Sequence, residues 1–301
     1  MKKLFYLTIL TFICALSASA QLTLPRDSQR QEISQTVGDT RISIVYHRPN
    51  TKGRKNIFGC ESTDVVPKGG VTYPCLVPYG QVWRTGANEN TTFEVSRDVT
   101  IAGQSLPAGK YGFHAIPNKS DWILIFSKDN DKWGSFSYDQ SKDQVRVQVK
   151  PIVADHRETL TYDFENVTAN STQVALRWEK VSVPFVVDIG DVNGRAVAQI
   201  REAIKNRKAD DFRPFNQGAG YVYAFRVKNS YEEAIGWLDE SIKARETFGN
   251  LNTKARILGE MGKTAEAIAT AEKAIAVGKA AKPAADTADL EKLVAEWKAK
   301  K

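Results

Sequence analysis

The residues best suited to chemistry gather in one polar and aromatic run, residues 77–92. Trp83 and Arg84 are adjacent there, and Asn88 and Glu89 follow after a short interval. A guanidinium, an amide and a carboxylate supply hydrogen bonds to a polar ligand, and an indole ring supplies a face for stacking. The run therefore indicates a site for a small polar ligand, and a glycan fragment suits that chemistry.

Two further stretches are expected to lie near this run. Residues 109–117 form a glycine-flanked strand in which alternation puts His114 on the face opposite Phe113. Residues 133–139 form an aromatic and glycine-rich run that begins at Trp133. Exposed aromatic rings flanked by polar side chains are suited to binding sugars. The predicted ligand-binding residues are Trp83, Arg84, Asn88, Glu89, His114 and Trp133.

A structural interpretation of the same residues stays open. Adjacent residues of a strand point to opposite faces, so at most one of Trp83 and Arg84 faces a core. Arg84 and Glu89 would then form a buried ion pair that locks the fold, Asn88 would cap a turn, and the tryptophans would fill the core. Gly86 is expected to adopt a backbone angle that other residues avoid, which suits a bend before the next strand.

Catalysis by these residues is a second hypothesis. Glu89 would act as a general acid or base with support from His114, in an envelope hydrolase that cleaves a glycan or a peptide. No G-x-S-x-G sequence signals a serine nucleophile. The three histidines, His47, His114 and His156, lack the spacing of metal ligands. We therefore predict no metal and no cofactor, and we expect a binding protein rather than an enzyme.

The N-terminus has the pattern of a secretory signal. Lys2 and Lys3 precede an apolar stretch over residues 4–16, and a small-x-small sequence ends at Ala20. We predict that residues 1–20 are a signal peptide and that the remainder is exported to the periplasm or the cell surface. The apolar stretch is shorter than the ~20 residues that a membrane-spanning helix needs, so we predict no transmembrane segment.

Removal of the signal leaves two cysteines, Cys60 and Cys75. An even pair in an exported chain indicates a disulfide, and the segment between them is rich in turn-forming residues. A bridge of this span stabilises a fold by roughly 3 kcal/mol in the chain-entropy model. Two free thiols, or a metal or redox site, are the alternatives.

The charge balance argues against nucleic acid as a partner. The chain has 42 basic and 35 acidic side chains and a formal charge of +7, and the two signs are interspersed. Binding to nucleic acid or to an anionic membrane surface calls for clustered positive charge.

The composition and the spacing of apolar residues change near residue 189. Before it, short alternating runs separated by Gly, Pro and Asn turns predict an all-β sandwich or barrel domain over 21–188. The runs are 40–47, 91–96, 110–116, 122–127, 144–150, 158–164, 172–178 and 181–187. After it, an Ala-rich pattern with apolar residues three or four apart predicts a helical domain over 189–301. The expected helices are 192–208, 216–228, 230–246, 251–261, 264–280 and 286–300.

The helical domain contains an internal sequence repeat. The segment that begins at Tyr231 recurs at Thr264, an offset of 33 residues, with Ala and Ile at matching places. This offset is close to the tetratricopeptide period, and the segment resembles that repeat. The resemblance implies helical hairpins that bind a protein partner, and a generic Ala-rich helical hairpin is the alternative.

The β domain resembles the domain-of-unknown-function 2911 family of exported bacterial proteins over about residues 22–186. The resemblance is carried by Pro25-Arg26, Arg48-Pro49, Ile57-Phe58-Gly59, Leu76-Val77-Pro78-Tyr79-Gly80, Val82-Trp83-Arg84-Thr85-Gly86-Ala87-Asn88-Glu89, Pro107-Ala108-Gly109, Trp133-Gly134 and Trp178-Glu179. It implies a β-rich periplasmic domain, and it implies no activity.

Three hypotheses follow, and the first is preferred. The β domain binds a small polar ligand without catalysis while the helical tail contacts a protein. Alternatively, Glu89 and His114 serve a hydrolase. In the third, the protein is a periplasmic scaffold with no small-molecule site, which a β domain without a concave pocket would favour.

Overall fold

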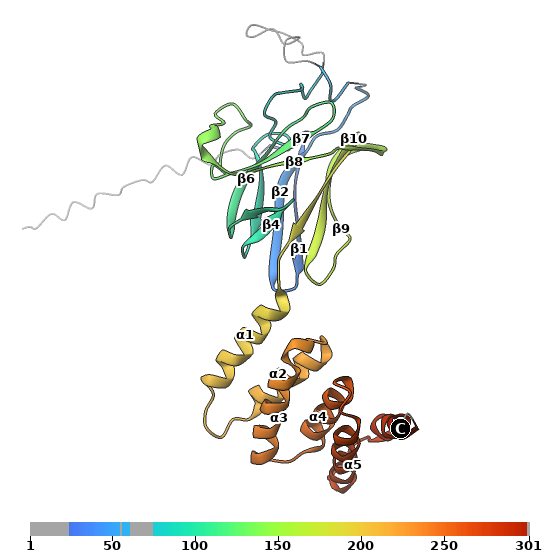
Figure 1. Ribbon diagram of the computed structural model, residues 1–301. Coiled ribbons are helices and arrows are strands. Elements are labelled where there is room, and N and C mark those ends of the chain that lie inside the picture. The colour runs from blue at the N-terminus through green and yellow to red at the C-terminus, as the bar shows by residue number, and fades with distance from the viewer. Residues whose placement is uncertain (1–23, 55, 61–74, 300–301) are drawn as a thin grey trace, which may run out of the picture.

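The computed structural model describes residues 24–54, 56–60 and 75–299. The predicted signal peptide, residues 1–20, lies outside the described residues. The chain forms a β domain followed by an array of helices, as the sequence predicts (Figure 1). No helix in the described ranges is long and apolar enough to cross a membrane.

Two antiparallel sheets make up the β domain. The larger sheet contains, in spatial order, β1 (Gln29–Val37), β2 (Thr40–Arg48), β3 (Thr91–Val95), β6 (Gly109–Ile116), β7 (Trp122–Ser127) and β8 (Asp143–Val149). The smaller sheet contains β5 (Gln104–Leu106), β4 (Val99–Ile101), β10 (Ser171–Asp188) and β9 (Ile152–Glu165). A short 3₁₀ turn, η2 (Gln140–Lys142), precedes β8.

One hydrophobic core lies between the two sheets. Phe113 of the larger sheet contacts Phe185 of the smaller one, with ring centroids 5.7 Å apart. Tyr46 and Tyr162 also meet across the domain, edge to face at 4.7 Å. Because side chains alternate along a strand, His47 and His114 then lie on the outer face of the larger sheet. This outer face carries the candidate site.

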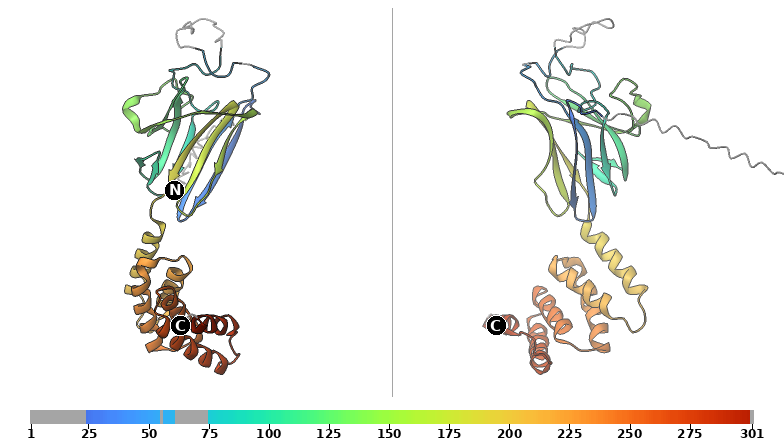
Figure 2. Two further views of the ribbon diagram at one scale, coloured as in Figure 1. Left: turned by 45° about the vertical axis from the view of Figure 1, so that its right-hand side comes forward. Right: turned by 180° about the vertical axis from the view of Figure 1, so that it is seen from behind.

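Helices follow the β domain (Figure 2), six of them α-helices within the described residues. Two smaller hydrophobic clusters hold them together. The α-helices are α1 (Val192–Lys205), α2 (Arg213–Ala224), α3 (Tyr231–Ala244), α4 (Phe248–Glu260), α5 (Thr264–Ala280) and α6 (Ala288–Ala299), with a 3₁₀ turn, η3 (Lys228–Ser230), before α3. The two copies of the internal sequence repeat begin α3 and α5. Their small residues Ala234 and Ala267 are fully buried, which lets neighbouring helices approach closely.

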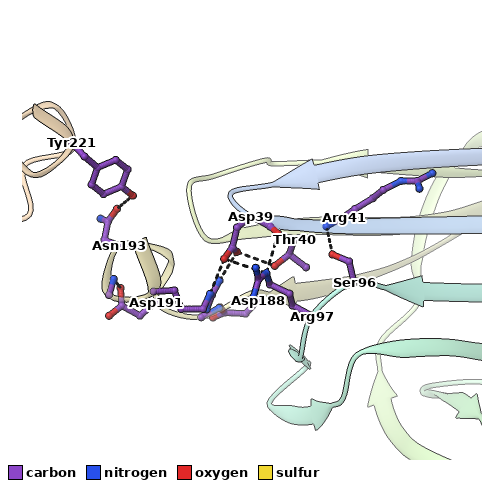
Figure 3. Close-up of polar contacts among 12 residues, drawn as sticks. Asp39, Thr40, Arg41, Ser96, Arg97, Asp188, Asp191, Asn193 and Tyr221 are labelled. Carbon is purple, nitrogen blue, oxygen red and sulfur yellow. Dashed lines mark hydrogen bonds and ion pairs between the residues drawn. The ribbon is translucent and has the colours of Figure 1, made fainter. Parts of the chain in front are cut away.

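A polar junction joins the two parts (Figure 3). Asp39, in the turn between β1 and β2, accepts hydrogen bonds from Arg195 of α1 through Nε at 3.0 Å and Nη2 at 2.8 Å. Arg97 lies 3.3 Å from the same carboxylate. Asp191 caps α1 by accepting from the backbone of Gly194 at 2.8 Å. The first helix is therefore tied to the β domain by an ion pair as well as by the chain.

Candidate functional site

Trp83 and Arg84 lie on opposite sides of their segment, and Trp83 is part of the core. A backbone bridge to Ala115 aligns the segment with β6. The Trp83 ring stacks on Trp178 with centroids 6.0 Å apart and contacts Phe58 edge to face. Its faces are therefore occupied by other aromatic rings, so Trp83 offers no platform for a ligand.

Arg84 is half-buried and has no carboxylate partner among the described residues. Its Nη1 donates to the backbone oxygen of Asn88 at 2.5 Å. The guanidinium also lies 5.6 Å from the centre of the Phe136 ring. Burial lowers the pKa of Arg84 from its ordinary value, but the group stays charged at neutral pH.

Glu89 pairs with Arg26 and not with Arg84. One nitrogen of Arg26, Nη1, donates to both carboxylate oxygens, at 2.8 and 2.7 Å. Nε2 of His47 lies 3.4 Å from Oε2. Both partners of the Arg26–Glu89 pair are about half exposed, at 49% and 45%. The buried Arg84–Glu89 ion pair considered from the sequence is therefore absent.

The hydrogen bond to Arg26 is the main cause that lowers the pKa of Glu89, so this carboxylate is ionised at neutral pH. Burial lowers the pKa of His47, which opposes the attraction of the nearby Glu89 charge. At neutral pH the two side chains are therefore a carboxylate beside a neutral imidazole.

The turn before β3 bends at Thr85 and Asn88, whose φ angles are 51° and 58°. A β-branched residue rarely adopts this conformation, and it is held here by buried hydrogen bonds. Thr85 Oγ1 donates to Phe113 O at 2.9 Å, and Thr85 O accepts from Tyr162. Gly86 is not left-handed, contrary to the expectation. A Cβ at Gly86 would lie 3.0 Å from the backbone oxygen of His47, so close packing explains the glycine.

Residues 133–138, here called the aromatic loop, cover part of the outer face. The loop is held to the turn because the backbone of Gly134 donates to Asn88 O at 3.1 Å and Trp133 bridges Glu89. A Cβ at Gly134 would approach Arg84 to 2.9 Å. The loop exposes two large rings, Trp133 at 53% and Phe136 at 84%.

His114 lies beneath this loop and away from solvent. Its Nδ1 is 3.2 Å from Ser135 Oγ, and its ring meets Tyr138 edge to face at 5.6 Å. Burial lowers the pKa of His114 to about 4, so the ring is neutral at neutral pH. His114 therefore supports the loop, and the histidine in contact with Glu89 is His47 instead.

A cleft of about 690 Å³ opens beside Glu89 on the outer face of the larger sheet. Its walls come from β1, β2, β3 and β6, the segment before β1, the turn before β3 and the loop after β7. The polar lining includes Arg26, Arg30, His47, Glu89, Asn90, Thr92, Lys110, Asn130 and Asp131. These groups offer both signs of charge and two amides, which is suited to binding a polar molecule. Within the described ranges, no three His, Cys, Asp or Glu residues are arranged to hold a metal.

The sequence of the β domain matches one family, described as "Protein of unknown function (DUF2911)", over residues 28–187. The chain belongs to this family. The DUF2911 match ends at the last strand, so the six helices lie outside it. No curated protein and no solved structure matches the chain.

The site on the outer face gains three residues that the sequence did not predict and loses two that it did. His47, Arg26 and Phe136 join it, whereas Trp83 and His114 pack beneath it. The alternation of β2 already put His47 opposite Tyr46, and hence off the core. Nothing local pointed to Arg26, which lies 63 residues from Glu89.

The disulfide between Cys60 and Cys75 is formed, with Cα atoms 5.7 Å apart. The backbone of Phe58 bridges Val77, and Tyr79 N donates to Cys60 O. The disulfide therefore fixes the segment that leads into Trp83 and Arg84.

Proposed function

We propose that the β domain binds a small polar ligand, such as a glycan fragment, without catalysing a reaction. The observation that carries the proposal is the aromatic loop, which exposes Trp133 and Phe136. The Trp133 ring lies 5.4 Å from the guanidinium carbon of Arg26, which lines the polar cleft. Exposed aromatic rings that lie together on a surface often mark a binding site. A sugar ring stacks on such faces while its hydroxyls reach amides and charged groups.

The charge state of Glu89 favours binding over hydrolysis. A glycoside hydrolase needs a carboxylic acid whose pKa is raised so that it can donate a proton near neutral pH. The pKa of Glu89 is lowered instead, chiefly by the Arg26 hydrogen bond. The neighbouring His47 serves to orient or accept a hydrogen bond rather than to carry charge.

Export of the protein is part of the proposal. The Cys60–Cys75 disulfide supports it, because disulfides persist in oxidising compartments such as the periplasm or the cell exterior. The cleft beside Glu89 favours the ligand-binding hypothesis over a scaffold without a site.

Thermal melting against a panel of envelope glycans tests the proposal. We expect at least one compound to raise Tm as its concentration rises, through a stabilisation of the folded state of about 2.7 kcal/mol at a hundredfold excess over Kd. Trp133→Ala should abolish the rise without unfolding the protein, because the ring is half exposed. Phe225→Ala is the matched control, since Phe225 is 61% exposed on the helical side. A rise that persists in Trp133→Ala would contradict the proposal.

The helical array is proposed to bind an acidic segment of a partner protein. A groove of about 780 Å³ lies between the end of α1, the start of α2 and the end of α3. Its walls include Arg207, Lys208, Arg213 and Arg245 against Asp210 and Asp211. Lys208 and Arg245 form no ion pair with any described residue. A Lys208→Glu, Arg245→Glu double variant should lose partners that the unaltered chain captures, and unchanged capture would refute the assignment.

A further inference from the structure

The segment before β1 lies against the candidate site. Residues 24–28, here called the N-terminal strap, carry Arg26 to the aromatic loop. One guanidinium nitrogen contacts both oxygens of Glu89, and the guanidinium carbon lies 5.4 Å from the centre of the Trp133 ring. A carboxylate beside an indole face is a receptor for a cation. The protein's own Arg26 occupies that receptor.

The receptor would carry unpaired negative charge without Arg26. Glu89 is ionised, and the pKa of His47 is lowered, so the imidazole supplies no compensating charge at neutral pH. The nearby cation Lys132 is paired with Asp131. Arg30 is likewise paired, with Glu32 at 3.2 Å. Another cation is therefore the natural replacement for the Arg26 guanidinium.

The N-terminal strap is weakly attached. Within the described ranges, no backbone–backbone hydrogen bond joins residues 24–28 to the rest of the chain. Its contacts are made through side chains, including Gln29 Nε2 to Arg26 O at 2.6 Å and Lys52 to Asp27 at 2.8 Å. Asn88 Nδ2 donates to Ser28 O at 3.3 Å. Exposed ion pairs contribute little stability, so a ligand can displace the strap.

On the basis of the ligand site proposed above, we infer that Glu89 and Trp133 bind a cationic group of the ligand. That group is a primary ammonium or a guanidinium, as found in an amino sugar or an arginine side chain. Arg26 holds the site as an internal competitor until the ligand replaces it. The apparent affinity of the unaltered protein is then reduced by the fraction of molecules in which Arg26 is bound.

Saturation-transfer NMR with two matched pairs of probes tests the inference. One pair is Nα-acetyl-arginine amide and its neutral counterpart Nα-acetyl-citrulline amide, and the other is glucosamine and N-acetylglucosamine. Arg26→Ala should bind the cationic member of one pair about fivefold more tightly than the unaltered protein does. Adding Glu89→Gln should remove the preference for the cation. Arg41→Ala, which removes an exposed arginine elsewhere on the larger sheet, should change nothing.

The pair that responds identifies the source of the cation, an arginine side chain or an amino sugar. Equal affinity of Arg26→Ala for charged and neutral probes would overturn the inference. Absence of any gain in Arg26→Ala would do the same. If N-acetylglucosamine binds as well as glucosamine and Trp133→Ala removes both, the ligand site stands while the cation preference falls. If no glycan and no probe binds any variant, both the site and the preference fall.

Discussion

The ion pair between Asp39 and Arg195 offers a quantitative test of how the helices are attached. Hydrogen bonds from Arg195 are the main cause that lowers the pKa of Asp39 from 3.8 to about 2. The full shift corresponds to about 2 kcal/mol, at about 1.36 kcal/mol for each pKa unit. The two side chains are 26% and 33% exposed, so solvent screening reduces this value. We expect Asp39→Asn to lower the free energy of unfolding by about 1 kcal/mol at pH 7.

The pH dependence of this loss has a definite sign. A lowered carboxyl pKa stabilises the folded state above the unfolded pKa, and that contribution disappears as the pH falls through the folded value. The difference in the free energy of unfolding between the unaltered protein and Asp39→Asn should therefore reach its full size above about pH 5 and vanish towards pH 2.

Urea unfolding, followed by tryptophan fluorescence over this pH range, measures this difference. Asp27→Asn is a suitable control, because Asp27 pairs with Lys52 but is 87% exposed. A difference of the same size at pH 7 and pH 3, or none at pH 7, would refute the assigned role of Asp39.

Three further predictions concern the support of the site. Gly112→Ala should lower the free energy of unfolding by about 3 kcal/mol, because the new Cβ would lie 2.1 Å from a backbone oxygen of the loop after β7. Gly236→Ala is the comparison, because a Cβ at this position of α3 meets open space. It should raise the free energy of unfolding, measured by chemical denaturation, by about 0.5–1 kcal/mol. Replacing Cys60 and Cys75 by Ser should lower it by about 3 kcal/mol, since the bridge closes a separation of 15 residues. With the pKa of His114 lowered to about 4, unfolded chains bind its proton more readily, so stability should fall from pH 6.5 to pH 4, and His114→Asn should flatten that fall.

Each of these predictions has a contrary outcome. Equal stability of Gly112→Ala and Gly236→Ala would show that the loop after β7 does not pack on β6. Unchanged unfolding after loss of the disulfide would show that the bridge does not restrain the unfolded chain. An imidazole of His114 that titrates near pH 6.5 by NMR would show that the aromatic loop leaves it in water.

The helices followed from the sequence more directly than the strands did. The Ala-rich periodicity depends only on neighbours three and four residues apart, so it survives without knowledge of the tertiary fold. The predicted strands 172–178 and 181–187 are instead one strand, β10, interrupted by an irregularity at Glu179, where φ is 54°. β1 was not recognised, because an edge strand with mostly exposed side chains has no apolar alternation to detect.

The candidate site was only partly accessible from sequence. The clustering of Arg84, Asn88 and Glu89 was visible because one turn carries all three. The sequence does not distinguish the exposed tryptophan from the buried one, because Trp83 and Trp133 both lie among polar and glycine-rich neighbours. The choice is made by packing, because Trp83 meets the ring of Trp178 from the other sheet.

The central claim is that the ligand meets the aromatic loop and not the core tryptophans. Titration of the protein with the glycan that gives the largest rise in Tm, followed through the indole N–H signals in NMR, tests it most directly, with Trp133→Phe used to assign one signal. We predict a saturable shift of the Trp133 indole signal, while the signal of Trp83 stays in place because that ring is packed against Trp178. Shifts confined to the Trp237 and Trp297 signals of the helices, with Trp133 unmoved, would contradict the account.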